Sequence, residues 1–415
     1  MKVAVVVNKF PVVSETFVIN HVVSLLEAGL DVTVFSLALP QQKQDIHPQF
    51  AAYRLQEHVI YGEAVPFNKI QRLHRFSRLL YKCLFHWNKP GVLKLLNFLK
   101  HGKKALDLSL FFNAQPFLFN NQFDIVHCHF GNVGNIVQKV KQAGLLNGKV
   151  VVSFHGFEFL QKHILAENNF YRDVFRNCDG IVANSKFTLD RLVKLGCAKE
   201  KLVIIPVIPN SQVFVKRQYI PYIEKKTTAF EILSIARLVE KKGIRYAIEA
   251  IQLLKTAHNI PVQYTIIGTG PLETELQEMV AQYNLKNEVR FLGAQPQNKI
   301  AESLAGIDVF LLPSIVDTKG DTETQGLVLI EAQLMKIPVV ATNVGGIPDS
   351  VADQESAILV EEKSPVQLAE ALLTLYNNKE LRHKMGKAGE KFVLDRFNTN
   401  SLTQKTICFY KALAR

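Results

Sequence analysis

The first half of the chain alternates strand-like runs with segments of helical period. The strand-like runs are short and mostly rich in β-branched or apolar residues, which is typical of strands buried on both faces of a parallel sheet. They lie at Val3–Val7, Asp31–Ser36, Phe123–Phe130, Lys149–Phe154, Gly180–Ala183 and Lys201–Pro206. The clearest helix follows the first run, with Ser14 as its N-cap, apolar positions from Phe17 to Leu26, and Gly29 as its stop. This strand–helix–strand order predicts a doubly wound α/β domain.

The second half repeats the alternation after a polar region punctuated by prolines. Strands are expected at Glu231–Ala236, Val262–Gly268, Glu288–Gly293, Asp308–Pro313, Pro338–Thr342 and Ser356–Val360. The intervals have helical spacing, so a second doubly wound domain is predicted. We expect a Rossmann-like domain at 1–206 with a basic helical insertion at about 66–118, a linker at 207–225, and a Rossmann-like domain at 226–395. A last helix at 396–415 is expected to pack back toward the first domain.

The insertion combines positive charge with apolar residues. Its helical pattern runs from Ile70 to Lys104, with leucines and aromatic residues interleaved among the cations. These cations are Lys69, Arg72, Arg75, Arg78, Lys82, Lys89, Lys94, Lys100, Lys103 and Lys104. The formal net charge of the chain is +12, which favours anionic partners. Two interpretations stay open, an anionic membrane surface and a solvated helix pair that covers the sheet. Nucleic acid is disfavoured because no nucleic-acid-binding motif accompanies the charge.

Cysteine usage and the length of the apolar runs bear on the compartment. The five cysteines are scattered without a Cys-x-x-Cys pair, as expected for free thiols in a reducing compartment. No apolar run reaches 18 residues, so no transmembrane helix is expected. The apolar start of the chain is interrupted at Asn8 and Lys9, too early for a signal peptide. We expect a cytoplasmic protein, either soluble or peripheral on the inner face of the plasma membrane.

The stretch from Leu311 to Lys336 carries the first chemical signal. It predicts a strand, a polar loop with Glu323, and a helix that starts at about Gly326 and contains Glu331. A helix N-terminus suits a phosphate, and carboxylates accept hydrogen bonds from hydroxyl groups. This order matches a sugar nucleotide, in which a diphosphate separates the hydroxyls of a sugar from those of ribose. Taken alone, two glutamates at this spacing are more often a solvated loop acid and a surface helix residue.

Other strand ends of the second domain supply groups for the same anion. Arg237 and Lys242 follow the first strand, where two cations can neutralise a diphosphate and stabilise charge on a leaving group. Gly268 and Gly270 form a tight turn after the second strand, and Gly345–Gly346 follow a later one. Because the carboxyl ends of parallel strands share one edge of a sheet, these groups are predicted to converge on one anion site.

The first strand of the first domain ends in a loop that leads into a helix. Ser14 closes this loop, and Glu15 and Thr16 lie in the first helical turn. Open α/β sheets bind ligands at this edge. Glu15 therefore either contacts a ligand or merely complements the helix dipole.

Three histidines belong to neighbouring predicted strands. His155, followed by Gly156, lies at the carboxyl end of a strand and is a candidate for ligand contact. His127 and His129 share one face of a strand, because strand side chains alternate. Packed or substrate-facing histidines are favoured over metal ligands here, since no further ligand cluster is evident. The acceptor-side candidates are Ser14, Glu15, Thr16 and His129.

Together these segments resemble the glycosyltransferases of family 4, a retaining class with the GT-B fold of two Rossmann-like domains facing across a cleft. The resemblance rests on His155-Gly156, ARLVEKKG, IGTGPL, and the glutamate pair within ETQGLVLIEA, and it extends over about residues 1–395. The opening FPVVSETF resembles members that build bacterial exopolysaccharides, including those of the colanic-acid type.

The resemblance implies roles for individual residues. Arg237 and Lys242 would hold the diphosphate, Glu331 the ribose and Glu323 the hydroxyls of the donor sugar. His155 would contact the donor sugar near the reacting carbon. Further donor-binding residues would be Gly268, Gly270, Thr324, Gln325 and Gly326. In the family, arginine, lysine and the helix N-terminus take the place of a metal, so neither a metal nor another cofactor is expected.

The implied reaction moves a sugar from a nucleoside-diphosphate sugar to a hydroxyl of a glycan or a polyprenyl-diphosphate-linked glycan, with retention of anomeric configuration. Two alternatives come from other classes. The first is a non-catalytic binder of nucleotide sugars or polyanions that uses the basic insertion. The second is a dinucleotide-dependent oxidoreductase, which is disfavoured because the first βα turn lacks Gly-x-Gly-x-x-Gly.

Overall fold

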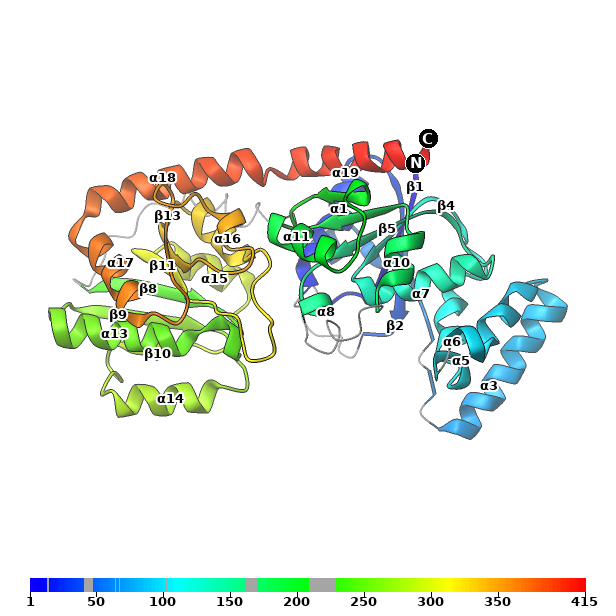
Figure 1. Ribbon diagram of the computed structural model, residues 1–415, viewed down its shortest axis with the longest axis horizontal. Helices are drawn as coiled ribbons and strands as arrows, with labels where there is room; N and C mark the ends of the chain where they lie inside the picture. The colour runs from blue at the N-terminus through cyan, green and yellow to red at the C-terminus, as the bar shows by residue number, and fades with distance from the viewer. Residues whose placement is uncertain are drawn as a thin grey trace.

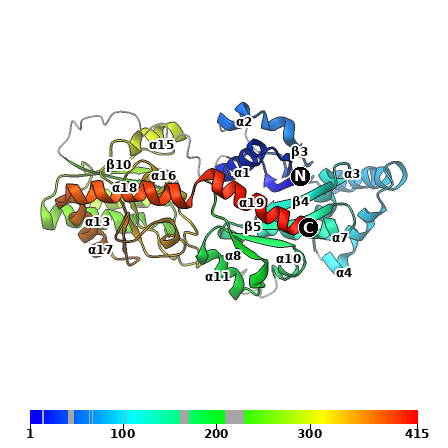
Figure 2. The same cartoon turned by 90° about the horizontal axis from the view of Figure 1, so that it is seen from above.

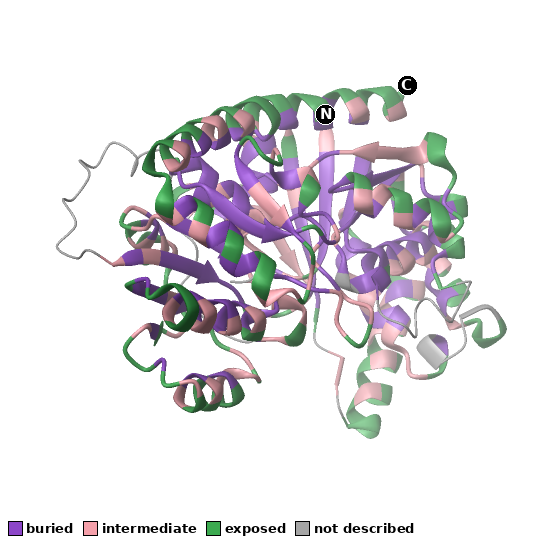
Figure 3. Ribbon diagram, turned by 60° about the vertical axis from the view of Figure 1, so that its left-hand side comes forward, coloured by how far each residue is buried: buried purple, intermediate pink, exposed green. Residues whose placement is uncertain are grey.

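The computed structural model describes residues 1–415 except 13–14, 41–47, 64, 67, 102, 161–169 and 209–228. The described residues form two parallel β-sheets flanked by helices, one sheet in each half of the chain (Figure 1). The strands are buried between the helices, and the outer faces of the helices are exposed (Figure 3). The predicted fold class of two doubly wound α/β domains is confirmed.

The first sheet has seven strands in the order β3-β2-β1-β4-β5-β6-β7. Their bounds are β1 (Lys2–Lys9), β2 (Asp31–Ala38), β3 (Val59–Tyr61), β4 (Gln122–His129), β5 (Asn147–Phe154), β6 (Gly180–Ala183) and β7 (Leu202–Ile204). β1 pairs with both β2 and β4, and its predicted run Val3–Val7 is fully buried. β3 is not among the predicted strands, because this short edge strand is only half-buried and no continuous apolar run marks it.

Helices and short turns cover this sheet. They are α1 (Thr16–Glu27), α2 (Pro48–Ala52), η2 (Leu55–His58), α7 (Gly131–Gln142), α8 (Phe157–Leu160), α10 (Arg172–Asn177), α11 (Lys186–Lys194) and η6 (Lys199–Lys201). α1 follows Glu15, its N-cap in the structure, and ends before Gly29, whose φ of +79° favours glycine. The predicted N-cap, Ser14, lies outside the described residues.

The insertion is helical, as its pattern from Ile70 to Lys104 indicates, but it is divided into several short elements. Its elements are α3 (Lys69–Tyr81), η3 (Lys82–His86), η4 (Pro90–Leu96), α4 (Phe98–His101), α5 (Lys103–Leu106), α6 (Ser109–Ala114) and η5 (Gln115–Phe117). The chain leaves the helix near Asn88, whose φ is +50°, and Pro90 has no N–H for a helical hydrogen bond. Leu95 and Phe111 join the core of the first domain, so the inner side of the insertion is anchored.

The second sheet has six strands in the order β10-β9-β8-β11-β12-β13. Their bounds are β8 (Phe230–Ile235), β9 (Val262–Ile267), β10 (Val289–Phe291), β11 (Val309–Leu312), β12 (Val339–Thr342) and β13 (Ala357–Val360). Each lies inside or within one residue of its predicted range, because these short strands are largely buried and read as apolar runs. The helical elements before the last two helices are η7 (Glu240–Lys242), α13 (Ile244–His258), α14 (Glu273–Gln282), α15 (Gln297–Leu304), α16 (Leu327–Leu334), η8 (Pro348–Ser350) and α17 (Pro365–Asn377).

The last two helices span both domains. α18 (Lys379–Arg396) packs on α16, whereas α19 (Thr399–Ala414) crosses to the first domain and packs on α1 and β4 (Figures 1 and 2). Ile407 and Tyr410 of α19 are buried in the core formed around β1 and α1. None of the described helices is long and apolar enough to span a bilayer.

Candidate functional site

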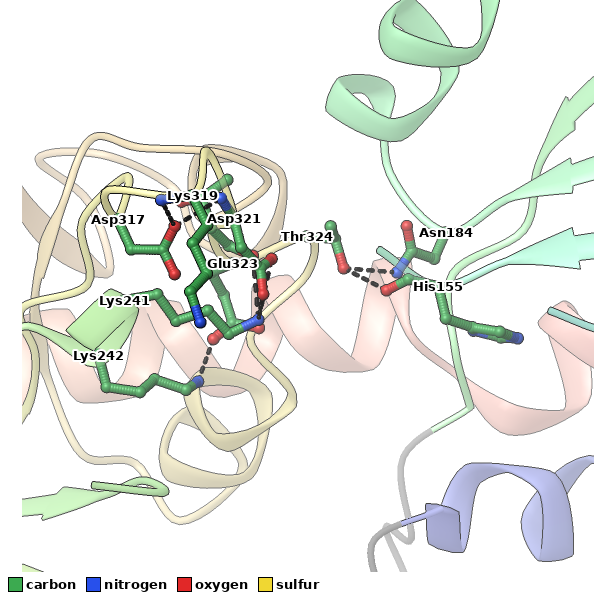
Figure 4. Close-up of polar contacts among 10 residues, drawn as sticks. His155, Asn184, Lys241, Lys242, Asp317, Lys319, Asp321, Glu323 and Thr324 are labelled. Atoms are coloured by element: carbon green, nitrogen blue, oxygen red, sulfur yellow. Dashed lines mark hydrogen bonds and ion pairs between the residues drawn. The ribbon is translucent and has the colours of Figure 1, made fainter. Parts of the chain in front are cut away.

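The loop from β11 to α16 lies at the carboxyl edge of the second sheet and carries two ion pairs. Lys242 Nζ pairs with the carboxylate of Glu323, and Lys241 Nζ lies 3.1 Å from Asp321 (Figure 4). The side chains of Lys242 and Glu323 are only 13% and 16% exposed. Burial raises the pKa of Glu323, but Lys242, Lys241 and the backbone N–H of Gly326 outweigh it and hold this pKa below its usual value. Glu323 is therefore an anion with Lys242 as its counter-ion.

α16 starts directly after this loop, as predicted. Gly326 is its N-cap at a φ of +74°, and no side chain caps the first turn. Glycine reaches this left-handed conformation without the steric cost that a side chain adds. The N–H of Gly326 is engaged by Glu323 and that of Leu329 donates to the carbonyl of Gly326, which leaves the N–H groups of Leu327 and Val328 for an anion.

Glu331, the second predicted acid, differs from Glu323. It lies in α16 and is partly exposed, and no group among the described residues hydrogen-bonds its carboxyl. Burial raises the pKa of Glu331 to about 8, since nothing offsets the desolvation of the charged form. Glu331 is therefore largely protonated at neutral pH.

Gly268 and Gly270 hold the turn after β9 against the loop after β8. A Cβ on Gly268 would lie 1.9 Å from the carbonyl oxygen of Ala236, and one on Gly270 would lie 2.4 Å from that of Leu238. The protein's own backbone thus requires glycine at both positions. Their direct part in binding a donor stays a prediction.

Gly345 and Gly346 hold the turn after β12 against the loop between β11 and α16. A Cβ on Gly345 would lie 2.0 Å from the carbonyl oxygen of Glu323. The N–H of Gly346 donates to that oxygen at 2.9 Å. The loops after β8, β9, β11 and β12 therefore meet at one edge of the sheet, as the sequence analysis predicts.

Arg237 is the predicted cation that keeps its charge free of a carboxylate. It lies on the loop between β8 and η7, and its side chain is exposed. Over the described ranges it forms no ion pair, whereas Lys242 is engaged with Glu323. The edge thus offers a ligand one free guanidinium beside a paired ammonium.

Thr324 and Gln325 join the two domains through their side chains. Thr324 Oγ1 donates to the carbonyl oxygen of His155 at 2.6 Å and accepts from Nδ2 of Asn184 at 3.2 Å (Figure 4). Gln325 exchanges two hydrogen bonds with the backbone of Val207, at 2.9 and 3.3 Å. Donor binding is the only role that the sequence predicts for these two residues, and their contact between the domains is seen only in the structure.

Two polar residues of the first domain were also missed. Asn184 directly follows β6, as His155 follows β5, so the strand-end argument that selected His155 applies to it as well. Glu158 accepts the N–H of His155 at 2.6 Å and thereby fixes the turn at His155 and Gly156. Burial raises the pKa of Glu158 to about 7, although backbone hydrogen bonds oppose the shift. The sequence feature that could have identified Glu158 is its position three residues after His155, because a carboxylate at this spacing can accept a backbone N–H within a turn.

The ring of His155 is turned into the first domain. Figure 4 shows the carbonyl of His155 facing Thr324, while its imidazole points away from the second domain. Its Nε2 lies 3.0 Å from Nδ1 of His129, whose Nε2 lies 2.9 Å from His21. Both nitrogens of His129 are therefore engaged inside the domain, which leaves neither for an acceptor. His127 and His129 share a face as predicted, with stacked rings 5.0 Å apart.

The remaining acceptor-side candidates lie at the start of α1. Glu15 and Thr16 are half-buried there, and burial raises the pKa of Glu15 to about 6. Ser14 lies outside the described residues. Among the residues that the structure describes, no group of three or more His, Cys, Asp or Glu is placed to hold a metal ion. The acceptor role of this region stays a prediction.

Known proteins resemble the chain over its whole length. The family described as "Glycosyl transferases group 1" matches residues 215–392, and "Glycosyltransferase Family 4" matches residues 14–207. The putative colanic acid biosynthesis glycosyltransferase WcaL of Escherichia coli K12 is 31% identical over 100% of both chains. The amylovoran biosynthesis glycosyltransferase AmsK of Erwinia amylovora is 32% identical over 90% of both. The chain belongs to glycosyltransferase family 4.

Solved structures share the fold of this family 4 glycosyltransferase. Anabaena HepE in complex with UDP matches with a TM-score of 0.70 and 16% identity, over 99% of this chain and 100% of that one. Sucrose-phosphate synthase of Thermosynechococcus elongatus matches with a TM-score of 0.68 and 18% identity, over 100% and 99%. The predicted GT-B fold is confirmed, and the family assignment confirms the predicted enzyme class.

The raised pKa of Glu331 predicts how stability depends on pH. Between pH 4.5 and 8 the folded glycosyltransferase holds a proton on Glu331 that the unfolded chain releases, so this residue stabilises the fold at low pH and loses that effect as pH rises. Glu331→Gln cannot ionise. The free energy of unfolding of Glu331→Gln, relative to wild type, should therefore rise between pH 5 and 8, by up to about 4 kcal/mol.

Chemical denaturation of the ligand-free protein at several pH values measures this difference. Glu370→Gln is the matched control, because Glu370 is an exposed glutamate on a helix of the same domain. Its difference from wild type should not change with pH. A flat profile for Glu331→Gln would show that Glu331 is ionised in the folded protein.

Proposed function

We propose that this family 4 enzyme transfers a hexosyl group from a nucleoside-diphosphate sugar to a hydroxyl of a glycan or lipid-linked glycan, with retention of anomeric configuration. The observation that carries the proposal is the meeting of four strand ends around the open N-terminus of α16, with a free guanidinium at Arg237. The relatives named for colanic acid and amylovoran biosynthesis support a role in surface polysaccharide synthesis. The neighbouring HepE structures with UDP and with UDP-glucose support a sugar nucleotide as donor.

The proposed donor spans the edge of the second sheet. Arg237 and the start of α16 bind the diphosphate through charge-assisted hydrogen bonds. Glu331 receives the ribose hydroxyls, which favour its ionised form and lower its pKa on binding. Glu323, held as an anion by Lys242, accepts hydrogen bonds from the sugar hydroxyls.

The proposed mechanism needs no protein base and no metal. The bond from the anomeric carbon to the diphosphate oxygen breaks with its electron pair, and Arg237, Lys242 and the helix N-terminus stabilise the charge that develops. The departing diphosphate oxygen takes the proton of the acceptor hydroxyl as that oxygen bonds to the anomeric carbon from the same face. The positive charge at the strand ends supports this proposal, because these groups supply the electrostatic stabilisation that a metal supplies elsewhere.

The acceptor is proposed to approach from the first domain. Glu15 and Thr16 lie at the carboxyl edge of that sheet, and the contact of Thr324 with His155 brings this edge to the donor side. Contact between the domains excludes water, which would otherwise hydrolyse the donor. A glycan attached to a polyprenyl diphosphate would place this acceptor at a membrane surface.

The insertion suits such a surface. Its outer side exposes large apolar side chains among cations, with Ile70 80%, Phe85 73% and Leu99 85% exposed. Lys69 and Arg78 of α3 are exposed beside them. Apolar side chains enter the interfacial layer while cations attract anionic lipids. We therefore propose that the outer side of the insertion binds an anionic bilayer, which places the enzyme peripherally on the inner face of the plasma membrane.

A donor screen tests the proposed function directly. UDP-, GDP- and ADP-sugars are assayed for thermal stabilisation, since a donor at 100 times its dissociation constant adds about 2.7 kcal/mol to the free energy of unfolding. One nucleotide class should stabilise the protein, and that donor should yield a product with retained anomeric configuration by NMR. Stabilisation without transfer to any glycan or lipid-linked acceptor would favour the non-catalytic alternative. NAD(P)H is assayed as a further arm of the same screen, and stabilisation by it alone would favour an oxidoreductase.

Replacing Arg237 by alanine should lower turnover by about 100- to 1,000-fold, because the leaving diphosphate loses one charge-assisted partner. The fold should be unaffected, since this side chain is exposed. The measurement is steady-state transfer with the donor found in the screen. Arg245→Ala is the matched control, because Arg245 is 56% exposed on α13 of the same domain. Near-normal turnover in Arg237→Ala would refute its assigned role.

The membrane proposal predicts a loss of vesicle binding. Ile70→Glu/Leu73→Glu should abolish co-flotation with vesicles that contain phosphatidylglycerol, since it places two charges on the exposed side of α3. Val366→Glu/Leu394→Glu changes two exposed apolar residues of the second domain and should float like wild type. Wild type should not float with purely zwitterionic vesicles. Flotation of the α3 variant with anionic vesicles would locate the contact elsewhere.

A further inference from the structure

Six side chains form one hydrogen-bonded series inside the first domain, which we call the histidine chain. In order, its members are Ser153, His127, Tyr410, His21, His129 and His155. The atoms in contact are Ser153 Oγ and His127 Nε2 (2.6 Å), His127 Nδ1 and Tyr410 Oη, Tyr410 Oη and His21 Nε2 (3.3 Å), His21 Nδ1 and His129 Nε2 (2.9 Å), and His129 Nδ1 and His155 Nε2 (3.0 Å). The far nitrogen of His155, Nδ1, is buried and has no hydrogen-bond partner within the described residues.

The imidazoles of the histidine chain are neutral at neutral pH. Burial lowers the pKa of His21 to about 4 and that of His155 to about 3. Burial and the neighbouring rings hold the pKa values of His127 and His129 well below the usual value. Burial raises the pKa of Tyr410 far above its usual value, so its hydroxyl keeps its proton. A neutral imidazole has one N–H and one acceptor nitrogen, so each ring donates to one neighbour and accepts from the other.

Two arrangements of protons satisfy every link with Tyr410 as both donor and acceptor. A third, in which Tyr410 Oη accepts from His127 and His21 together, leaves both its own hydroxyl proton and Nδ1 of His155 without a partner among the described residues. In the forward arrangement Ser153 donates to His127, the donations continue in chain order, and all four imidazoles carry their proton on Nδ1. In the reverse arrangement His155 donates to His129, and all four carry their proton on Nε2. A ring with the other tautomer would place two donors or two acceptors against each other.

Hydrogen-bond accounting favours the forward arrangement. In the reverse one, the hydroxyl proton of Ser153 has no acceptor and Nδ1 of His155 has no donor, counting the described residues. In the forward one, only the Nδ1–H of His155 lacks a partner. Each unmet buried polar group costs stability, so the arrangement with fewer of them is preferred.

We propose that the histidine chain runs forward, so that Ser153 and Tyr410 fix His155 as its Nδ1–H tautomer and make it a hydrogen-bond donor. Ser153 and Tyr410 are positioning residues, since they act on His155 through other side chains. The inference rests on the proposed function only for the group that receives this N–H, an oxygen of the sugar nucleotide. His155 lines a cavity of about 40 Å³ that reaches Asn184 and Val207 beside the interdomain contact. Its Nδ1 is buried in the ligand-free protein, so a neighbouring group or the ring itself must shift before an oxygen of the sugar nucleotide can meet this N–H.

This tautomer determines what His155 can do. Its Nε2 accepts from His129 and its Nδ1 carries a proton, so neither nitrogen can take the proton of an acceptor hydroxyl. His155 therefore serves as a hydrogen-bond donor and not as a general base. The assignment agrees with the proposed mechanism, in which the leaving diphosphate takes that proton.

NMR spectra of the full-length protein labelled with [¹⁵N]histidine test the proposal at pH 7.5, because long-range ¹H–¹⁵N correlations distinguish the Nδ1–H from the Nε2–H tautomer. His155→Gln assigns the signals of His155, which lies at the end of the chain. Wild type should show the Nδ1–H tautomer at His21, His127, His129 and His155. The Nε2–H tautomer at His155 in wild type would overturn the proposal.

Two variants remove the source and the middle of the chain. In Ser153→Ala the forward and reverse arrangements leave the same number of buried polar groups without a hydrogen-bond partner. All four histidines should therefore become tautomer mixtures. Tyr410→Phe keeps the buried ring but cuts the chain, so His127 should keep its Nδ1–H form while the other three become mixtures. An unchanged tautomer at His155 in both variants would overturn the proposal.

Tyr264→Phe is the matched control. Tyr264 is a fully buried tyrosine whose hydroxyl donates to Ser234 at 2.8 Å in the second domain, away from the histidine chain. Its loss should leave all four tautomers unchanged. With an active donor, Tyr410→Phe should lower kcat about 3- to 10-fold, the effect of one neutral hydrogen bond, and leave the donor KM within about twofold. If wild type transfers no sugar, the proposed function fails, while the spectra still decide the tautomer.

Discussion

The backbone of the loop between β11 and α16 is the constraint on which the site depends. The N–H of Gly346 donates to the carbonyl of Glu323 in this loop, and this carbonyl leaves no room for a side chain on Gly345, as the carbonyl of Thr324 leaves none on Gly346. The same segment places the carboxylate of Glu323 on Lys242 and the hydroxyl of Thr324 on the carbonyl of His155. One stretch of chain therefore orders the charges of the second domain and sets its contact with the first. A change in its path would alter both.

The two sides of this contact use buried polar groups in opposite ways. On the second domain, burial is offset by opposite charge, and the pKa of Glu323 stays low because Lys242 and Lys241 outweigh desolvation. Among the described residues of the first domain no opposite charge offsets burial, so the pKa of His155 falls to about 3 and that of Glu158 rises to about 7. The first-domain side of the contact is therefore made by neutral groups, such as the carbonyl of His155, while the second-domain side carries charges. In the proposed reaction negative charge develops on the departing diphosphate, so the stabilising cations are needed on the second domain and not on the acceptor side.

Much of this arrangement could be predicted from the sequence, because it follows from short-range patterns. Buried parallel strands read as apolar runs, and the residues that follow them share an edge, which was enough to bring Arg237 and Gly268 together. The half-buried strand β3 has no such run, and the turn at Asn88 depends on a backbone conformation that helical periodicity does not encode. The pairing of Lys242 with Glu323 could not be predicted, since two suitable partners at a sheet edge do not reveal whether they bind each other or a ligand.

The histidine chain could not be predicted from short-range sequence patterns. It also gives α19 a second role. His127 and His129 were predicted to share a face, but their partners His21 and Tyr410 lie on helices far away in sequence, so only the folded chain joins them. α19 follows the second domain in sequence yet docks on the first, where apolar residues such as Ile407 supply its packing. Packing alone would tolerate a small rotation of this helix. The hydroxyl of Tyr410 does not, because it must meet two imidazole nitrogens at once, and directional hydrogen bonds of this kind fix an orientation that apolar contacts leave loose.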